Sequence, residues 1–254
     1  MSDQKLPLQD TPPHTDSWGD PLGDALKEYL SNPSSSDTII VHIDIAEEEY
    51  LPVAHFFRNE QTISELEKQA LTACRGHVLD IGAGAGSLSL ILQSRGLTTT
   101  AIDVSEGAVW VMNQRGVQNA HCVNILDFGD EKYDTLLMMM NGLGVVGTLD
   151  GLANFLEQAK DMLKPDGQIL LDSADILYMY EDEEGGYWID LNGAYYGEVT
   201  YQMEYNQVKG EPFAWLFVSF DVLSEYAEAA GFTCELLFTD ENDQYLARLT
   251  QLHS

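Results

Sequence analysis

The stretch His77-Val-Leu-Asp-Ile-Gly-Ala-Gly-Ala-Gly86 decides the fold of this 254-residue chain. Its first half is an apolar, β-favouring run, which is typical of a parallel strand buried on both faces. Glycine then stands at every second position, and the residues up to Gly96 carry apolar side chains at helical spacing. The pattern predicts a strand, a tight turn and the start of a helix. Because glycine lacks Cβ and a helix N-terminus offers unpaired N–H groups, such a turn can hold a nucleotide-like ligand.

Two kinds of nucleotide site share a glycine-rich turn after a strand. The dinucleotide fingerprint G-x-G-x-x-G would need its third glycine at position 87, where this chain has Ser87. The spacing Asp-x-Gly-x-Gly-x-Gly, from Asp80 to Gly86, resembles instead the first motif of the class I S-adenosylmethionine-dependent methyltransferases. A glycine-rich turn can also be only a tight loop, so the segments that follow decide between these interpretations.

An acidic residue ends the next predicted strand, Leu97–Asp103. Asp103 follows Gly86 by 17 positions, close to the spacing of about 20 residues at which a strand-end carboxylate binds ribose hydroxyls. We expect Asp103 to accept two charge-assisted hydrogen bonds from a ribose. The alternative is that Asp103 caps the helix predicted over 106–115, although Ser105 is an equally good cap.

Two further predicted strands end in polar residues. Ala120–Asp127 is the first, and the resemblance implies that Asp127 receives the adenine amino group, although aspartate is also a common turn residue. Tyr133–Met140 has the length of a buried strand and runs into Asn141, in the loop that faces both cofactor and acceptor in the family. The cofactor implied is S-adenosyl-L-methionine, and its predicted binding residues are Arg58, Asp80, Gly82, Ala83, Gly84, Gly86, Asp103, Val104, Leu126, Asp127, Met140 and Asn141.

The order of the remaining elements extends the resemblance from His77 to the end of the chain. A helix is predicted over 149–163, a turn at Lys164-Pro-Asp-Gly167, a fifth strand over 168–172, and two last strands over 232–238 and 244–249. The resemblance implies an α/β fold with a three-layer Rossmann-like sheet of about seven strands. Most strands would be parallel, with an antiparallel last strand, an N-terminal helical lid and an inserted β-hairpin.

The chain is predicted to divide into three parts: a flexible tail over 1–19, a lid segment over 20–76 and a methyltransferase domain over 77–254. The lid would contain helices at 21–30 and 61–73 and a strand at 38–45. An insertion at 174–220 holds 12 of the 25 aromatic residues. Segments 197–205 and 211–218 predict a hairpin, added to the sheet edge or folded over it, that packs on itself or covers the acceptor.

Composition limits the partners. Forty-two acidic against twelve basic residues give a formal charge of −30, which repels nucleic acids and anionic membranes, although it is also compatible with a merely solvated surface. No apolar run approaches the roughly 18 residues of a membrane span, and Met1–Asp20 resembles neither a signal nor a transit peptide, so we expect a cytoplasmic protein. Three cysteines and six histidines lack metal-ligand spacing, so no metal is expected. The oligomeric state stays open.

The resemblance implies transfer of an activated methyl group to a small molecule, for which the protein chiefly aligns the acceptor. No catalytic base is assigned; Asp175, Tyr178 and Asn141 lie near the expected acceptor. Arg58 either reaches the carboxylate of the cofactor's methionine part or forms a surface salt bridge. One alternative is a noncatalytic module that binds the nucleoside cofactor and recruits a partner through its acidic surface. A nucleotide-dependent oxidoreductase is disfavoured by Ser87.

Overall fold

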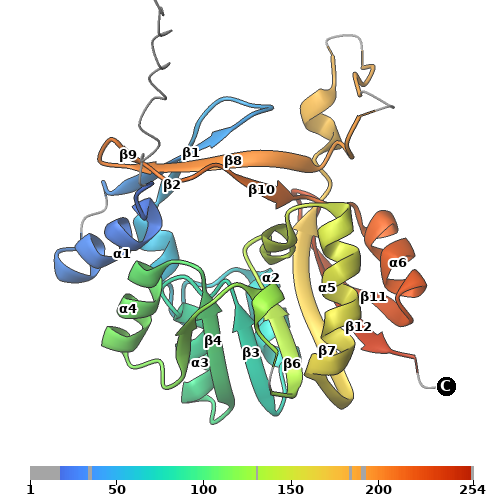
Figure 1. Ribbon diagram of the computed structural model, residues 1–254, viewed down its shortest axis with the longest axis horizontal. Coiled ribbons are helices and arrows are strands. Elements are labelled where there is room, and N and C mark those ends of the chain that lie inside the picture. Colours follow the sequence, from blue (N-terminus) through green and yellow to red (C-terminus); the bar gives the residue numbers. More distant parts are fainter. Residues whose placement is uncertain (1–17, 34–35, 130, 183–184, 190–192, 253–254) are drawn as a thin grey trace, which may run out of the picture.

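The computed structural model describes residues 18–33, 36–129, 131–182, 185–189 and 193–252. A seven-stranded sheet forms its centre (Figure 1). Its strands are β3 (His77–Ile81), β4 (Thr98–Asp103), β5 (Ala120–Cys122), β6 (Tyr133–Met138), β7 (Leu163–Ala174), β11 (Phe232–Thr239) and β12 (Gln244–Gln251). The spatial order is β11-β12-β7-β6-β3-β4-β5. The strands from β7 to β5 pair in parallel, whereas β12 pairs antiparallel with both neighbours. The predicted α/β sheet with its antiparallel last strand is confirmed.

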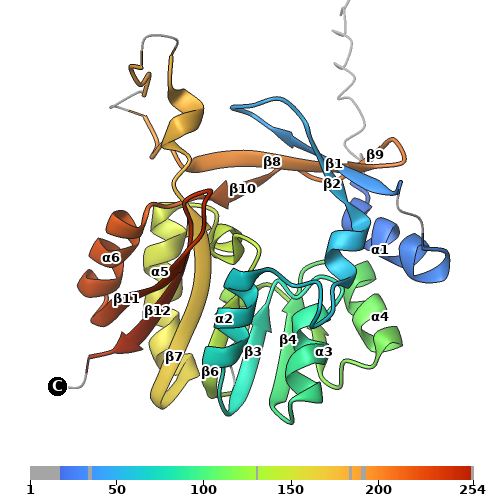
Figure 2. The same cartoon turned by 180° about the vertical axis from the view of Figure 1, so that it is seen from behind.

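Helices cover both faces of this sheet (Figures 1 and 2). They are α2 (Glu65–Ala73) and α3 (Ser87–Ser94) on one face, α5 (Leu149–Met162) and α6 (Phe220–Ala229) on the other, and α4 (Glu106–Arg115) beside the β4–β5 edge. Side chains alternate along the buried strands as the pleat requires. In β6, Leu136 and Met138 pack in the cluster that contains α5 and α6, and Leu137 packs in the cluster that contains α2 and α3.

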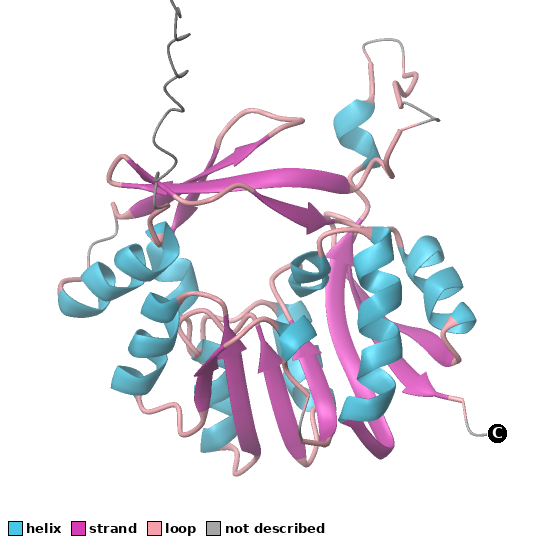
Figure 3. Ribbon diagram, in the orientation of Figure 1, coloured by secondary structure: helices cyan, strands magenta, loops and turns pink. Residues whose placement is uncertain are grey.

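A second, antiparallel sheet crosses over the carboxyl ends of the central strands (Figure 3). It consists of β1 (Thr38–Ile43), β2 (Glu49–Pro52), β8 (Glu198–Tyr205), β9 (Val208–Lys209) and β10 (Phe213–Leu216). The order is β10-β8-β1-β2, with β9 paired to β8. The predicted hairpin is therefore not added to the edge of the central sheet. It pairs with the N-terminal strand β1, and helix α1 (Pro21–Ser31) packs under this sheet in the cluster that contains Val41 and Tyr205.

Several element boundaries differ from the sequence prediction. Helix α2 begins at Glu65, not at residue 61, because Ser64 and Glu67 form a capping box that starts it. Strand β1 ends at Ile43, before the predicted end, and β2 was not predicted. The turn expected at 164–167 lies within β7, where Asp166 has a φ of 63° and the pairing with β6 shifts register. It is an irregularity in a longer strand.

The N-terminal segment contributes to two layers of the structure. Helix α1 and strands β1 and β2 belong to the second sheet, whereas Leu66, Ala70 and Leu71 of α2 pack on the central sheet. The expected tail over 1–19 lies outside the described residues except for Trp18 and Gly19. The domain division stays a prediction. It consists of the boundaries expected at residues 20 and 77 and the insertion over 174–220. Within the described part of the chain, every helix is too short or too polar to cross a membrane.

Candidate functional site

A cavity of about 1350 Å³ lies between the carboxyl ends of the central strands and the second sheet. The chain order of the central strands reverses between β3 and β6. In open α/β sheets, ligands bind outside the strand ends at such a switch point. The cavity therefore occupies the place that the topology of the sheet favours for a ligand.

The glycine turn after β3 forms part of the cavity floor. Gly82, Gly84 and Gly86 have φ values of 71°, 55° and 76°, a region that favours glycine. Gly82 and Gly84 line the cavity together with Ala83. A Cβ on Gly82 would meet only Val145, at 3.5 Å. Gly86 instead caps α3, and a Cβ there would lie 2.6 Å from Val117, so this glycine permits helix packing and lies outside the cavity lining.

Asp103, at the end of β4, is buried in the cavity wall. Its Oδ2 accepts a hydrogen bond from the Gly84 N–H at 2.8 Å, and its Oδ1 accepts one from the Ser105 N–H at 2.9 Å. Burial raises the pKa of this carboxyl above its usual value. Ser105 is the N-cap of α4 and accepts from the Ala108 N–H, so the alternative in which Asp103 caps that helix is wrong. Val104 also lines the cavity.

Asp80 is a second buried carboxylate of the floor, and its Oδ2 accepts a hydrogen bond from the Ser89 hydroxyl at 2.6 Å. Burial raises its pKa to about 6. The folded protein therefore keeps a proton between pH 4 and 6 that the unfolded chain loses. The charge of Asp80 thus destabilises the fold progressively as the pH rises through this window.

We expect Asp80→Asn to remove this pH dependence. The unfolding free energy of the variant, relative to the wild type, should rise by up to about 3 kcal/mol between pH 4 and 7, measured by denaturant titration. Asp134→Asn is the control, because the His77 N–H and Lys164 hold the pKa of Asp134 below its usual value. The difference in unfolding free energy between Asp134→Asn and the wild type should not change with pH above pH 5. If the difference in unfolding free energy between Asp80→Asn and the wild type does not change with pH, the raised pKa of Asp80 is contradicted.

The turn after β6 brings Met140 and Asn141 into the cavity lining. Both residues have positive φ, 69° and 51°, which is strained for residues with side chains. The buried Asp172 carboxylate holds this turn by accepting hydrogen bonds from the Met140 N–H at 3.1 Å and the Gly142 N–H at 2.8 Å. Burial raises the pKa of Asp172 to about 6. Asn141 Nδ2 donates to the Leu216 carbonyl at 3.3 Å, which leaves its buried Oδ1 without a partner among the described residues.

Arg58 also lines the cavity, and its guanidinium pairs with the Glu67 carboxylate and donates to the His55 carbonyl. The Arg58 and Glu67 side chains are only 9% and 6% exposed, so this is a buried ion pair and not the surface salt bridge that was the alternative for Arg58. The Nε atom of Arg58 is buried and lacks a partner within the described residues. One donor of this guanidinium is therefore unpaired among the described residues.

Three predicted residues are not brought to the cavity: Gly86, which caps α3, and Leu126 and Asp127. Val123, Asn124 and Ile125 line it after β5, whereas Leu126 and Asp127 are exposed and lie outside the lining. The cause is a 3-10 turn, η2 (Ile125–Asp127), which buries its first residue and leaves the next two in solvent. The adenine contact of Asp127 stays a prediction.

Of the three candidate bases, only Asn141 lines the cavity. Asp175 lies outside it and accepts hydrogen bonds from the Leu177 N–H at 2.9 Å and the Tyr196 hydroxyl at 2.7 Å. Tyr178 is 65% exposed and also lies outside the lining. The position of these two residues near a strand end does not bring them to the site, because Asp172 is the last residue of β7 that lines the cavity.

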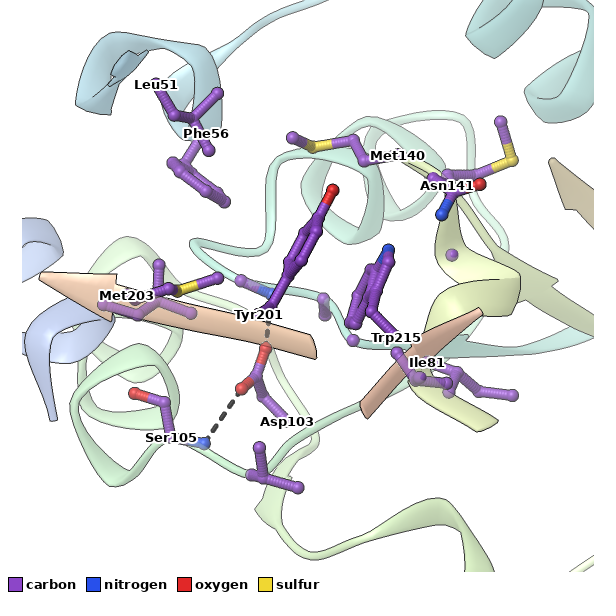
Figure 4. Close-up of a pocket in the computed structure, with 18 of the residues that line it drawn as sticks. Leu51, Phe56, Ile81, Asp103, Ser105, Met140, Asn141, Tyr201, Met203 and Trp215 are labelled. Carbon is purple, nitrogen blue, oxygen red and sulfur yellow. Dashed lines mark hydrogen bonds between the residues drawn. The ribbon is translucent and has the colours of Figure 1, made fainter. Parts of the chain in front are cut away.

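The second sheet supplies an aromatic wall, which we define as Tyr201, Phe213 and Trp215. The rings of Tyr201 and Trp215 stack at 5.6 Å with an interplanar angle of 7°, and Phe213 meets Trp215 edge-on at 5.9 Å. Figure 4 shows Tyr201 and Trp215 beside the turn that carries Met140 and Asn141. A Cβ on Gly144 would lie 2.1 Å from the Trp215 ring, so this glycine lets the ring approach the turn after β6.

Sequence reasoning missed Glu67, Asp172 and the individual residues of the aromatic wall. The enrichment of aromatic residues over 174–220 was the signal for the wall. Glu67 had a signal in the capping-box spacing from Ser64, but nothing local marks Asp172 as more than a strand residue. In the described part of the chain, histidine, cysteine and carboxylate side chains form no cluster that could hold a metal ion.

Comparisons with known proteins agree with this geometry. A family model described as a methyltransferase domain matches residues 78–167. A comparison with curated protein sequences finds no match. Among solved structures, a SAM-dependent methyltransferase from Bacteroides fragilis, in complex with S-adenosyl-L-homocysteine, is 39% identical over 92% of this chain and 95% of that chain, with a TM-score of 0.86.

Two more distant structures show the same fold. The CcbJ methyltransferase from Streptomyces caelestis is 14% identical over 74% of this chain and 89% of that chain, with a TM-score of 0.53. A DhpI–SAM–HEP complex is 20% identical over 72% of this chain and 84% of that chain, with a TM-score of 0.54. Because the Bacteroides fragilis protein is similar along nearly its whole length, this chain belongs to the S-adenosylmethionine-dependent methyltransferases.

Proposed function

We propose that this methyltransferase acts on a small molecule, by in-line transfer of the sulfonium methyl group. The observation that carries the proposal is the cavity itself, which joins the glycine turn of the central sheet to an aromatic wall on the second sheet. A cavity of about 1350 Å³ has room for a nucleoside cofactor together with a small acceptor. A formal charge of −30 further disfavours nucleic acid as the acceptor.

The floor of the cavity fits the cofactor. Gly82 leaves its side of the turn open, whereas the Phe56 ring lies beside Gly84, and Asp103 presents a carboxylate next to the turn. Each oxygen of Asp103 accepts one backbone hydrogen bond and keeps further acceptor capacity, which two ribose hydroxyls can use. When bound, S-adenosylmethionine supplies a methyl group that is already activated as a sulfonium.

Residues around the turn would complete the cofactor site. We infer that Arg58 directs its free donor toward the carboxylate of the methionine part, with its orientation fixed by Glu67. Asp80 and Met140 also line the cavity, as do Ala83 and Val104, which would lie beside the ribose. Since Leu126 is exposed and outside the lining, its contact with the cofactor requires movement of the η2 turn.

The acceptor would lie between the strained turn at Met140 and the aromatic wall. Residues on both sides can hold its nucleophile in line with the methyl group and exclude water, and orientation of this kind supplies several kcal/mol. No side chain is assigned as the catalytic base. The cytoplasmic location predicted from the sequence stays a prediction.

We expect methyl transfer to metabolites in extract from the source organism. With methyl-labelled S-adenosylmethionine, label should enter the small-molecule fraction in the presence of the protein, and boiled protein should transfer none. Label confined to proteins or nucleic acids would contradict the small-molecule acceptor. Tight binding of the cofactor without transfer to any fraction would favour the noncatalytic alternative.

A further inference from the structure

We propose that the methyl acceptor is an amine whose N–H group donates a hydrogen bond to Asn141 Oδ1 while its apolar body packs against the aromatic wall. The inference rests on the proposed function and names the class of acceptor for the same cavity. It follows from three independent features of the described residues: an unpaired acceptor atom, the charge of the lining and the flat apolar surface opposite.

The Asn141 side chain is held in one orientation, and its hydrogen bonding is incomplete. Its Nδ2 donates to the Leu216 carbonyl at 3.3 Å, which fixes the direction of the amide. Its Oδ1 is buried and has no donor among the described residues. Buried acceptors are almost always paired, so an unpaired one in a cavity wall indicates a missing ligand donor. Because oxygen here can only accept, the group that meets it must carry an N–H or O–H.

The backbone around Asn141 supports a ligand role for its amide. Two consecutive residues with side chains, Met140 and Asn141, have left-handed conformations, and such strain concentrates at functional sites. The Asp172 carboxylate bridges the N–H groups on both sides of the strained pair, and Gln244 donates to the same carboxylate at 2.8 Å. The structure therefore holds Asn141 in one place against its local preference.

The charge of the cavity lining favours an amine over other hydrogen-bond donors as the acceptor of the methyl group. Eight carboxylate side chains line the cavity within the described residues, against two lysine or arginine side chains, Lys27 and Arg58. Arg58 is already paired with Glu67. Such a cleft raises the local concentration of cations and repels carboxylates and phosphates. An amine arrives as the ammonium ion and gains from this field, whereas an alcohol does not.

The aromatic wall indicates the body of the acceptor. Tyr201 and Trp215 present neighbouring rings 5.6 Å apart at an angle of 7°, and Met203 lines the cavity next to them. A stacked pair of rings offers a flat, mostly apolar surface, which suits an aryl or alkyl group. The acceptor would thus carry its nitrogen toward Asn141 and its apolar part toward the second sheet.

The transfer step balances with the neutral amine as nucleophile. The ammonium first loses a proton to solvent, and the freed nitrogen lone pair then forms the new N–C bond as the S–C bond breaks. The sulfur keeps that electron pair and becomes a neutral thioether, while the nitrogen takes the positive charge. The methylated ammonium leaves the cavity with that charge, so one proton is released for each methyl group transferred.

Three probes with the same aromatic body test the proposal. Isothermal titration of the protein saturated with S-adenosylhomocysteine would compare 2-phenylethylamine, 2-phenylethanol and 3-phenylpropanoate. We expect the amine to bind at least tenfold more tightly than the alcohol and the carboxylate to bind weakest. An alcohol or carboxylate that binds as tightly as the amine would overturn the inference.

Asn141→Gly removes the amide and suits the left-handed backbone. Asn206→Gly is the matched control, because Asn206 also has a positive φ, 48°, and lies exposed in the β8–β9 turn. We expect only Asn141→Gly to lower the affinity for 2-phenylethylamine, at least tenfold. A loss of S-adenosylhomocysteine affinity with unchanged amine affinity would assign Oδ1 to the cofactor and overturn the inference. Wild-type protein that fails to bind S-adenosylhomocysteine would contradict the proposed function itself.

Discussion

Replacing Asp103 with alanine is expected to lower the affinity for S-adenosylmethionine and S-adenosylhomocysteine by roughly 10²- to 10⁴-fold. The variant loses two charge-assisted hydrogen bonds to the ribose, each worth about 1.5–3 kcal/mol, and about 1.4 kcal/mol corresponds to a factor of ten. The loss should be equal for both ligands, because they share the ribose. Isothermal titration measures both affinities.

The Asp103 carboxylate also accepts backbone hydrogen bonds from Gly84 and Ser105, so a matched control is needed. Asp134→Ala provides it, since the Asp134 carboxylate also accepts a backbone hydrogen bond, from the His77 N–H at 2.7 Å, and lies outside the cavity lining. Asp103→Asn retains the side-chain shape if the alanine variant does not fold. Affinities within a few-fold of the wild type in a folded Asp103 variant would show that the ribose is held elsewhere.

Gly82→Ala is expected to weaken cofactor binding by about 10- to 100-fold, as judged by titration with S-adenosylhomocysteine. The new methyl group would stand on the cavity floor, where it meets only Val145 at 3.5 Å and occupies space that the cofactor needs. Overpacking of this kind typically costs about 1–3 kcal/mol. The folded protein should otherwise be retained.

Backbone strain alone could also weaken binding, because Gly82 has a φ of 71°. Gly96→Ala separates the two effects. Gly96 has a φ of 83°, and a Cβ there would meet nothing within 4 Å, so this variant carries similar strain without filling the cavity. Equal affinities for the two variants would remove the glycine turn from the cofactor site.

The central sheet could be predicted because most of its parallel strands are local runs of apolar or β-branched residues, with the short, largely exposed β5 as the exception. Tyr133–Met138 reads as buried on both faces in the sequence and alternates between two helical layers in the structure. The turn from Gly82 to Gly86 and the acidic strand end at Asp103 have spacings that depend only on neighbouring elements. Local patterns of this kind are sufficient to predict the residues that form the floor of the cavity.

The second sheet could not be predicted from local patterns. It pairs β1 with β8, so that Val41 lies opposite Met203, more than 150 positions away in the chain. The sequence pattern predicts each strand separately, and no periodicity indicates which strands pair. The predicted hairpin was therefore correct as an element. Its position was left open between the sheet edge and the sheet face, and its partner strand β1 was not predicted.

Site residues that act through a tertiary contact were also missed. Asp172 is a strand residue in sequence, and its role arises because the turn after β6 places two N–H groups beside it. Leu126 and Asp127 were placed at the site by their position after a strand, but the η2 turn leaves both exposed. Strand-end position predicts proximity to the cavity, and the local turn decides the side-chain direction.

A crystal structure of the protein with S-adenosylhomocysteine tests the central claim most directly. We predict that both ribose hydroxyls lie within hydrogen-bond distance of the Asp103 carboxylate, above the turn at Gly82 and Gly84. The thioether sulfur should face the space between Asn141 and the aromatic wall. A ribose away from Asp103, or a sulfur separated from the aromatic wall, would contradict the account.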